Sequence, residues 1–171
     1  MSNHQLTEPK LIQPPVHNDL RGSFIKPFNY DQMPVDFKEY FVSNSNKGVI
    51  RGLHFQKPPF DHSKLVSVLS GSIIDVIVDL RKNSKTFQQV QSFSLNSSNG
   101  HSLFIPTGFA HGFLSLEDNT IVSYLVSSTY SKESDDGILY SSIDFDWNIK
   151  SPILSNRDLG FQTLQNYDSP F

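Results

Sequence analysis

Turn-forming residues interrupt this chain at such short intervals that it has no room for several long helices. There are ten Pro and nine Gly, and turn clusters such as NSNKG, KPPFD, LSGS, NSSNG and LEDN separate the apolar runs. Within those runs apolar residues alternate with polar ones, a pattern typical of strands. The alternating rows are Val66 and Val68; Ile74, Val76, Val78 and Leu80; Phe93 and Leu95; Leu103 and Ile105; and Val122, Tyr124 and Val126. The spacing predicts an all-β chain of many short antiparallel strands.

The Ser70-Gly71 pair lies between two of these alternating runs. A Gly at such a point is typical of a tight turn between neighbouring strands, so the sequence predicts a hairpin here. Ser67, Asp75 and Asp79 then fall on the face opposite the apolar rows. Asp75 fits an inward polar group behind a site, and Asp79 fits a solvated carboxylate equally well.

Helix is expected only as short peripheral turns. The best helical window, residues 29–37, is interrupted by Pro34, which limits it to one or two turns. Many short strands without a fixed repeat favour a sandwich or jelly roll over a propeller or solenoid. We expect one domain over residues 1–171, with a peripheral extension from about Leu159 that is rich in Gln, Asn, Asp and Ser.

Composition narrows the functional classes. Charged residues make up 18% of the chain and the formal net charge is -3, so no basic surface is expected for nucleic acid. There is no Cys, which removes disulfides, thiolate nucleophiles and cysteine metal sites together. The chain shows neither a signal-peptide pattern nor a long apolar run, and we expect a cytoplasmic protein with no membrane partner.

Two of the six His residues have unusual neighbours. His54 lies in RGLHFQ, where Arg51 and Gln56 share an apolar strand with it, and His111 lies in IPTGFAHGF. Taken alone, each is more often an imidazole at the edge of the core, satisfied by a backbone carbonyl, than a functional group.

The segment Pro106-x-Gly108-x-x-His111 resembles the second short motif of the cupin jelly rolls. In metal cupins the first motif supplies two His and a Glu, with the Glu a short distance before a turn Gly. Here the position before Gly71 that matches this Glu is Lys64, and no His-x-His precedes it. An ammonium group cannot ligate a divalent cation, so the resemblance implies a cupin-type barrel with no metal and no cofactor.

A wider resemblance covers the chain from about Arg21 to Asp158. The segments that carry it, in order, are KGVIRGLHFQ at 47–56, KLV at 64–66, DVIVD at 75–79, IPTGFAHGF at 105–113 and PILSNRD at 152–158. In order and spacing these segments resemble the dTDP-4-dehydrorhamnose 3,5-epimerase family. Each is weak alone, but five ordered segments identify the chain as a member.

The resemblance implies an enzyme that acts on nucleoside-diphosphate 4-keto-6-deoxy sugars in deoxysugar biosynthesis. The C4 ketone makes the hydrogens at C3 and C5 acidic, and inversion needs a base, an acid on the other face and a group that holds the enolate. His54 matches the family's base and Asp158 the carboxylate that orients it. Lys64 matches the cation beside the enolate, and Tyr124 matches the acid. Without the resemblance, Asp158 fits an exposed loop aspartate, Lys64 an edge lysine and Tyr124 a core residue equally well.

A second group of residues is predicted to bind substrate. Arg21, Arg51 and His111 match family positions near the diphosphate, where forked Arg donors suit phosphate oxygens. The full predicted set is Arg21, Arg51, His111, Gln56, Glu39, Phe41, Lys26 and Tyr130. The remaining arginines, Arg81 and Arg157, are expected in surface or structural pairs.

This chain departs from the family around the sugar and the nucleobase. Lys26 replaces an acidic residue, and Glu39 and Phe41 stand where the family has Gln and Asn. The family's Tyr-Lys pair reads Tyr124-Leu125 here, and Thr129 replaces one of two aromatics, which leaves Tyr130. The resemblance therefore leaves open the nucleotide (dTDP, CDP or GDP) and whether C3, C5 or both are inverted.

Two other functions fit the same motifs. A related cupin group moves the ketone of such sugars from C4 to C3, and a non-catalytic cupin would only bind the sugar nucleotide. The resemblance also implies a homodimer. Whether Arg21 serves its own pocket or that of the partner stays open at this point.

Overall fold

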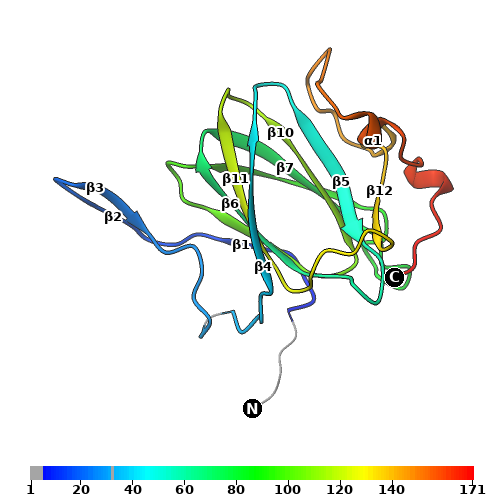
Figure 1. Ribbon diagram of the computed structural model, residues 1–171, viewed down its shortest axis with the longest axis horizontal. Coiled ribbons are helices and arrows are strands. Elements are labelled where there is room, and N and C mark those ends of the chain that lie inside the picture. The colour runs from blue at the N-terminus through cyan, green and yellow to red at the C-terminus, as the bar shows by residue number, and fades with distance from the viewer. Residues whose placement is uncertain (1–5, 32) are drawn as a thin grey trace.

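The computed structural model describes residues 6–31 and 33–171. Two five-stranded sheets enclose the core, and all strand pairings within them are antiparallel (Figure 1). The first sheet has the order β1 (Lys10–Ile12), β9 (Ser102–Ile105), β6 (Lys64–Ser70), β11 (Thr120–Val126), β4 (Glu39–Ser45). The second has the order β12 (Asp135–Gly137), β5 (Ile50–Gln56), β10 (Phe109–Ser115), β7 (Ser72–Asp79), β8 (Val90–Asn96). The prediction of an all-β antiparallel jelly roll is confirmed.

The core between the two sheets is built from the alternating rows of the sequence. Every second residue of a strand points to the same face, so each row delivers its apolar side chains to one layer. This inner core contains Val66, Val68, Ile73, Ile77, Leu95, Leu103, Ile105, Phe109, Phe113, Val122, Tyr124 and Val126. Each fully buried aliphatic or aromatic side chain stabilises the fold by about 1.5–3 kcal/mol.

The Ser70-Gly71 turn does not form the predicted hairpin. It joins β6 to β7, and these strands belong to different sheets. Gly71 has a φ of +79°, and a Cβ there would lie 2.4 Å from the Thr120 hydroxyl oxygen. The residue is therefore a corner glycine, and alternation alone cannot distinguish a corner between sheets from a hairpin within one.

Strand β7 is buried on both faces. Its row Val76 and Val78 faces away from the inner core and packs under the C-terminal part of the chain. Asp75 and Asp79, expected opposite the apolar row, lie in the same row as the inner-core residue Ile77 and are both fully buried. Central strands covered on both sides lose the simple alternation between buried and exposed residues.

The tail predicted as a peripheral extension is part of the packing. Leu164 is buried in the layer that covers the second sheet, and the rings of Tyr167 and Phe171 lie 5.5 Å and 5.8 Å from that of Phe55. This segment, red in Figure 1, lies beside β5 and β12 and follows the short helix α1 (Asn156–Leu159). Its apolar residues are spread among polar ones, so the sequence pattern does not show this packing.

The helical turns follow the sheets in the chain. They are η1 (Tyr140–Ser142), α1 and η2 (Leu164–Asn166). Among the described residues, the window 29–37 contains no assigned helix and only one helix-like hydrogen bond, from the Met33 amide to the Asn29 carbonyl (3.0 Å). No helix of the described chain is long and apolar enough to cross a membrane.

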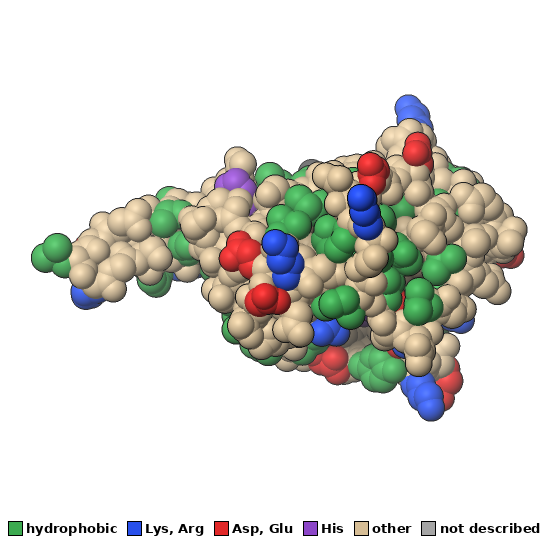
Figure 2. Space-filling model, turned by 90° about the horizontal axis from the view of Figure 1, so that it is seen from above, with side chains coloured by type: hydrophobic (Ala, Val, Ile, Leu, Met, Phe, Trp, Pro, Cys, Tyr) green, Lys and Arg blue, Asp and Glu red, His purple; other side chains and the backbone are tan. Residues whose placement is uncertain are grey.

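Strands β2 (Val16–Asp19) and β3 (Gly22–Ile25) form a separate hairpin. This arm projects from the body, and Figure 2 shows hydrophobic and basic side chains at its tip (Figures 1 and 2). Leu20 and Phe24 on the arm are exposed large hydrophobic residues.

Candidate active site

One cavity of about 300 Å³ opens between the two sheets. The inward-facing side chains of β4, β6 and β11 form one wall, and those of β5 and β10 form the other. Most of the predicted site residues line it: Glu39, Phe41, Arg51, His54, Gln56, Lys64, His111, Tyr124 and Tyr130. The fold therefore gathers residues that are up to about ninety positions apart in the chain.

His54 projects from β5 into this cavity and is held from behind by Asp158. Its Nε2 lies 2.9 Å from Asp158 Oδ1, and the Gly52 amide donates to Oδ2 (3.0 Å). Gly52 has a φ of +125°, and a Cβ there would lie 2.5 Å from the Gly112 Cα, so this close approach of β5 and β10 requires glycine. Asp158 lies on α1, where its amide donates to the N-cap hydroxyl of Ser155 (3.1 Å).

The surroundings of His54 favour a neutral imidazole. Burial lowers the pKa of His54, the Asp158 carboxylate opposes this shift, and the cations of Lys64 and Arg157 add to it. Burial would raise the pKa of Asp158, but hydrogen bonds from His54, Gly52 and Ser155 outweigh it and lower that pKa. With Nε2–H donating to a carboxylate, Nδ1 keeps its lone pair and is the basic nitrogen.

Lys64 brings a buried ammonium group to the same cavity. It begins β6, and its side chain donates from Nζ to the His54 carbonyl (3.1 Å). Burial lowers its pKa to about 8, against the opposing charges of Asp135 and Asp75. The group is still largely protonated at neutral pH and carries a positive charge in a poorly solvated site.

Tyr124 faces the cavity from β11, in the sheet opposite His54. Its hydroxyl lies 3.3 Å from the Ser43 hydroxyl, and the Phe41 ring stacks on it with centroids 4.7 Å apart. Burial raises the pKa of Tyr124 above its usual range, so the phenol remains a proton donor.

His111 forms a second imidazole–carboxylate pair deeper in the barrel. Its Nε2 lies 2.8 Å from Asp75 Oδ2, and both residues are buried. His111 is directly opposite His54 in the pairing of β10 with β5, and its ring lies 6.3 Å from that of Tyr124. The second oxygen of Asp75 is buried and has no hydrogen-bond partner within residues 6–31 and 33–171.

Among the predicted binding residues, Arg51 is exposed to the cavity, whereas the side-chain amide of Gln56 is occupied by hydrogen bonds within the protein. Arg51 is exposed at the cavity and donates to the Ser45 hydroxyl (2.9 Å) and the Asn44 carbonyl (3.0 Å). The Gln56 amide is engaged within the protein: its nitrogen donates to the Phe60 (2.7 Å) and Thr129 (3.1 Å) carbonyls, and its oxygen accepts from the Ser131 amide (2.6 Å). Gln56 therefore shapes the wall of the cavity.

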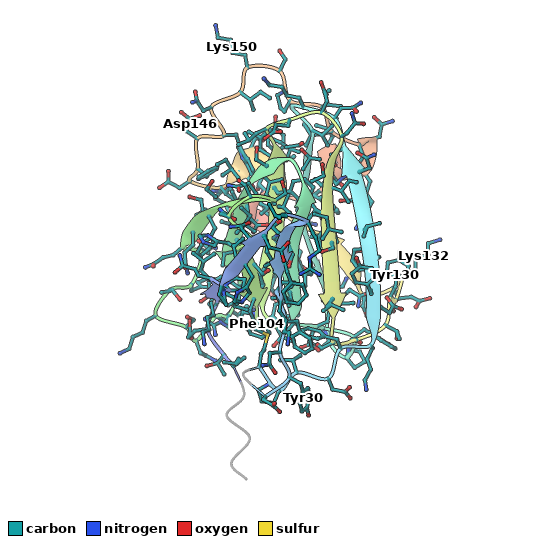
Figure 3. All side chains as sticks on the ribbon, turned by 90° about the vertical axis from the view of Figure 1, so that its left-hand side faces the viewer. Tyr30, Phe104, Tyr130, Lys132, Asp146 and Lys150 are labelled. Atoms are coloured by element: carbon teal, nitrogen blue, oxygen red, sulfur yellow. The ribbon has the colours of Figure 1, made fainter. Side chains whose placement is uncertain are left out.

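Glu39 and Tyr130 form part of the cavity rim. The Tyr130 amide donates to Glu39 Oε1 (3.2 Å), and Figure 3 shows Tyr130 beside β4. The Tyr130 hydroxyl donates to Asp135 (3.3 Å).

Arg21 and Lys26 do not reach this cavity within the chain. Arg21 is at the tip of the β2–β3 arm and pairs with Asp19, and its side chain is 90% exposed. Lys26 lines a different cavity, of about 470 Å³, between β1 and the arm. The two residues were predicted for the substrate site, but the arm extends away from the body and carries them with it.

Three ionisable residues of the cavity were not among the predicted site residues. Asp135, Arg157 and His62 all line it. Arg157 forms the predicted structural pair, with Asp135 (2.7 Å), but this pair lies in the cavity wall. Burial lowers the pKa of His62 to about 3, and its Nδ1 lies 3.0 Å from Gln56 Nε2. No local sequence signal marks these contacts.

A metal centre was not expected, and His54 and His111 each pair with a single carboxylate. Within residues 6–31 and 33–171, no group of three or more His, Cys, Asp or Glu side chains could hold a metal ion.

The antiparallel jelly roll, with a cavity between its sheets that His54, Lys64 and Tyr124 line, defines a protein of the cupin class. Residues 3–166 match the family model described as dTDP-4-dehydrorhamnose 3,5-epimerase. The dTDP-4-dehydrorhamnose 3,5-epimerase of Shigella flexneri is 39% identical over 166 residues, which cover 92% of each chain. The chain belongs to the dTDP-4-dehydrorhamnose 3,5-epimerase family and is an isomerase.

Solved structures agree in fold. The Bacillus anthracis dTDP-4-dehydrorhamnose 3,5-epimerase with TDP and PPi bound has a TM-score of 0.90 and 42% identity, over 92% of this chain and 95% of that chain. The Legionella pneumophila dTDP-6-deoxy-D-glucose-3,5-epimerase in complex with dTDP-4-keto-L-rhamnose has a TM-score of 0.88 and 36% identity, over 97% and 93%. The predicted cupin jelly roll is confirmed.

Proposed function

We propose that this chain epimerises a nucleoside-diphosphate 4-keto-6-deoxy sugar, inverting C3, C5 or both through an enolate. One observation carries the proposal: His54 and Tyr124 reach the same cavity from different sheets, so a sugar ring between them meets a base and an acid on opposite faces. The ammonium of Lys64 shares that cavity. Inversion at a carbon next to a ketone needs these three functions.

In the proposed reaction, His54 Nδ1 removes the proton from the carbon next to the ketone. The C–H electron pair forms a carbon–carbon double bond, and the carbonyl electrons move to oxygen to give an enolate. Lys64 stabilises this negative charge, which a buried cation does better than a solvated one. The enolate then collapses and takes a proton from the Tyr124 hydroxyl on the opposite face. Solvent returns a proton to Tyr124 and removes one from His54.

We infer that the nucleotide is dTDP. The relatives named above are dTDP-sugar enzymes, and the Legionella protein was solved with dTDP-4-keto-L-rhamnose. Arg51 supports the binding of a diphosphate because its guanidinium is exposed at the cavity. Glu39 and Phe41, which depart from the family, line the same cavity, so we assign the choice among 4-keto sugars to them.

We also propose that the protein works as a homodimer. The β2–β3 arm exposes Leu20 and Phe24 and carries Arg21 away from its own cavity. Large apolar side chains on a projecting hairpin favour burial against a second surface. Docking of the arm on a second copy would bring a guanidinium to the partner and cover both apolar residues.

The test is incubation with a panel of dTDP-, CDP- and GDP-linked 4-keto-6-deoxy sugars in heavy water, with products identified by NMR. We expect deuterium at C3, C5 or both, with inverted configuration, and the fastest reaction with dTDP sugars. A 3-keto product would instead show a ketoisomerase. Binding with no exchange on any substrate would show a non-catalytic cupin.

A further inference from the structure

An ion pair in the cavity wall has no role in the proton transfers above. Arg157 on α1 and Asp135 on β12 are joined at 2.7 Å, and both line the cavity. The Arg157 side chain is 46% exposed and that of Asp135 is 19% exposed. The pair thus connects the helix that carries Asp158 with the edge strand beside β5.

The guanidinium of Arg157 is held against His54. Arg157 Nη1 lies 3.5 Å from His54 Nε2, on the side where Asp158 binds the imidazole. Its Cζ lies 5.0 Å from the centre of the Phe161 ring, and that ring meets His54 edge-on at 5.7 Å. An ion pair, an aromatic face and the imidazole therefore fix where the positive charge stands.

The carboxylate of Asp135 lines the cavity into which Lys64 also projects. In the pairing of β12 with β5, Asp135 is opposite Gln56, which follows His54 by two residues on β5. The Asp135 carboxylate accepts a hydrogen bond from the Tyr130 hydroxyl (3.3 Å). It shares the cavity with Lys64. The ion pair therefore places its positive end beside His54 and its negative end in the cavity that Lys64 shares.

We propose that Arg157 and Asp135 are positioning residues whose paired charges set the pH range of the site. Arg157 keeps the His54 imidazole neutral to lower pH. Asp135 keeps the Lys64 ammonium charged to higher pH. The effect on activity rests on the proposed function, but the effect on the two side chains does not.

The signs follow from the charges around each group. The charged groups that act on His54 are Asp158 and Arg157 from α1 and Lys64 from β6. A nearby cation disfavours the protonated imidazole and so lowers its pKa. Lys64 faces Asp135 from β12 and Asp75 from β7, and an anion favours the charged ammonium. Other titratable or charged side chains at the cavity are Glu39, Arg51, His62, His111, Tyr124 and Tyr130.

The test uses two variants and a matched control. Arg157→Gln removes the positive end and Asp135→Asn removes the negative end, with little change in side-chain size. Lys82→Gln removes a cation of the same exposure, 46%, from an ion pair with Asp168 (2.6 Å), and neither residue lines the cavity. NMR titration of the His54 imidazole nitrogens and the Lys64 Cε, without substrate, reads the pKa of each group directly.

We expect Arg157→Gln to raise the pKa of His54 by about 0.5 unit or more, the size of a nearby, partly solvated charge. We expect Asp135→Asn to lower the pKa of Lys64 by a similar amount and not to raise that of His54. Lys82→Gln should move neither. Arg157→Lys, which restores the charge, should return His54 toward its wild-type pKa.

The same variants should also shift the pH profile of kcat/KM. We expect the wild-type rate to fall at low pH, where His54 is protonated, and at high pH, where Lys64 loses its proton near pH 8. Arg157→Gln should move the acid limb to higher pH, and Asp135→Asn should move the alkaline limb to lower pH. A merely structural role would lower the rate without moving either limb.

Unchanged titrations of both groups in both variants would overturn the proposal, whatever the activity. If the titrations shift as expected but the wild-type protein reacts with no 4-keto sugar, the role of the charge pair is supported and the proposed function is rejected.

Discussion

In the described part of the chain, two imidazole–carboxylate pairs have their histidines on neighbouring strands, and the two pairs differ in their exposure to the cavity. His54–Asp158 and His111–Asp75 have nearly the same geometry, with Nε2 to oxygen distances of 2.9 Å and 2.8 Å. The side chain of His54 is 29% exposed, whereas that of His111 is 4% exposed. Geometry alone does not mark the base, because a base must reach a substrate.

The two carboxylates differ as well. Asp158 accepts from His54 with one oxygen and from the Gly52 amide with the other. Asp75 binds His111 with one oxygen, and its other oxygen has no partner among the described residues. A fully bonded carboxylate fixes its imidazole in one orientation, so the first pair is suited to proton transfer and the second to holding the wall beneath Tyr124.

The largest expected effect separates the two imidazoles. His54→Ala should lower the rate of solvent-deuterium exchange into substrate by about 10⁴-fold, because the imidazole that removes the proton is lost. His111→Asn is the matched variant, and it should retain exchange at least tenfold above His54→Ala. NMR of the substrate in heavy water measures both. Equal losses of exchange rate in His54→Ala and His111→Asn would contradict the assignment of His54, rather than His111, as the base.

Asp158→Asn should have the next largest effect. The amide offers one oxygen where two donors, His54 and the Gly52 amide, need acceptors, so the imidazole stays present but poorly oriented. We expect a loss of roughly 10²-fold in exchange and a free energy of unfolding lower by about 1–3 kcal/mol. Kinetics and urea denaturation measure these quantities, and wild-type exchange in this variant would contradict the role of Asp158.

Asp75→Asn should have a smaller effect, although the pair it changes is more deeply buried. Only one of its oxygens is bonded, so an amide can keep the hydrogen bond from His111. We expect exchange within about tenfold of wild type, because general-base catalysis by His54 is untouched. A loss as large as that of Asp158→Asn would show that both pairs take part in proton removal.

Chelation should have no effect. Both imidazoles are bonded to carboxylates through Nε2, and Lys64 stands where metal cupins place a ligand. Exchange and epimerisation should therefore survive exhaustive treatment with EDTA. A loss that one added divalent cation restores would reassign the imidazoles as ligands.

The sequence predicts the composition of the inner core well but not its topology. The rows through Val66, Leu103 and Val122 point inward as expected because each lies on a strand with one face to the core. The Ser70-Gly71 corner and the two buried faces of β7 could not be predicted, since alternation does not say which sheet or which layer a row faces.

The candidate site was predictable only in part. The resemblance to a family named His54, Lys64 and Tyr124, and the fold brings all three to one cavity. The resemblance did not include Arg157 and Asp135 among the site residues, because nothing in the sequence around either residue indicates that the two form an ion pair in the cavity wall. Arg21 lies on the projecting arm, and no local pattern in the sequence shows that this arm extends away from the cavity.

The central claim is that protons move on two faces, from base His54 to acid Tyr124, and one measurement tests it most directly. Tyr124→Phe keeps the ring that stacks on Phe41 and deletes only the donor. In heavy water, NMR should show that this variant exchanges substrate hydrogen for deuterium with retained configuration and forms no epimer, because His54 can return a proton only to the face it came from. Epimer formation at the wild-type rate would contradict the account and make Tyr124 a core residue.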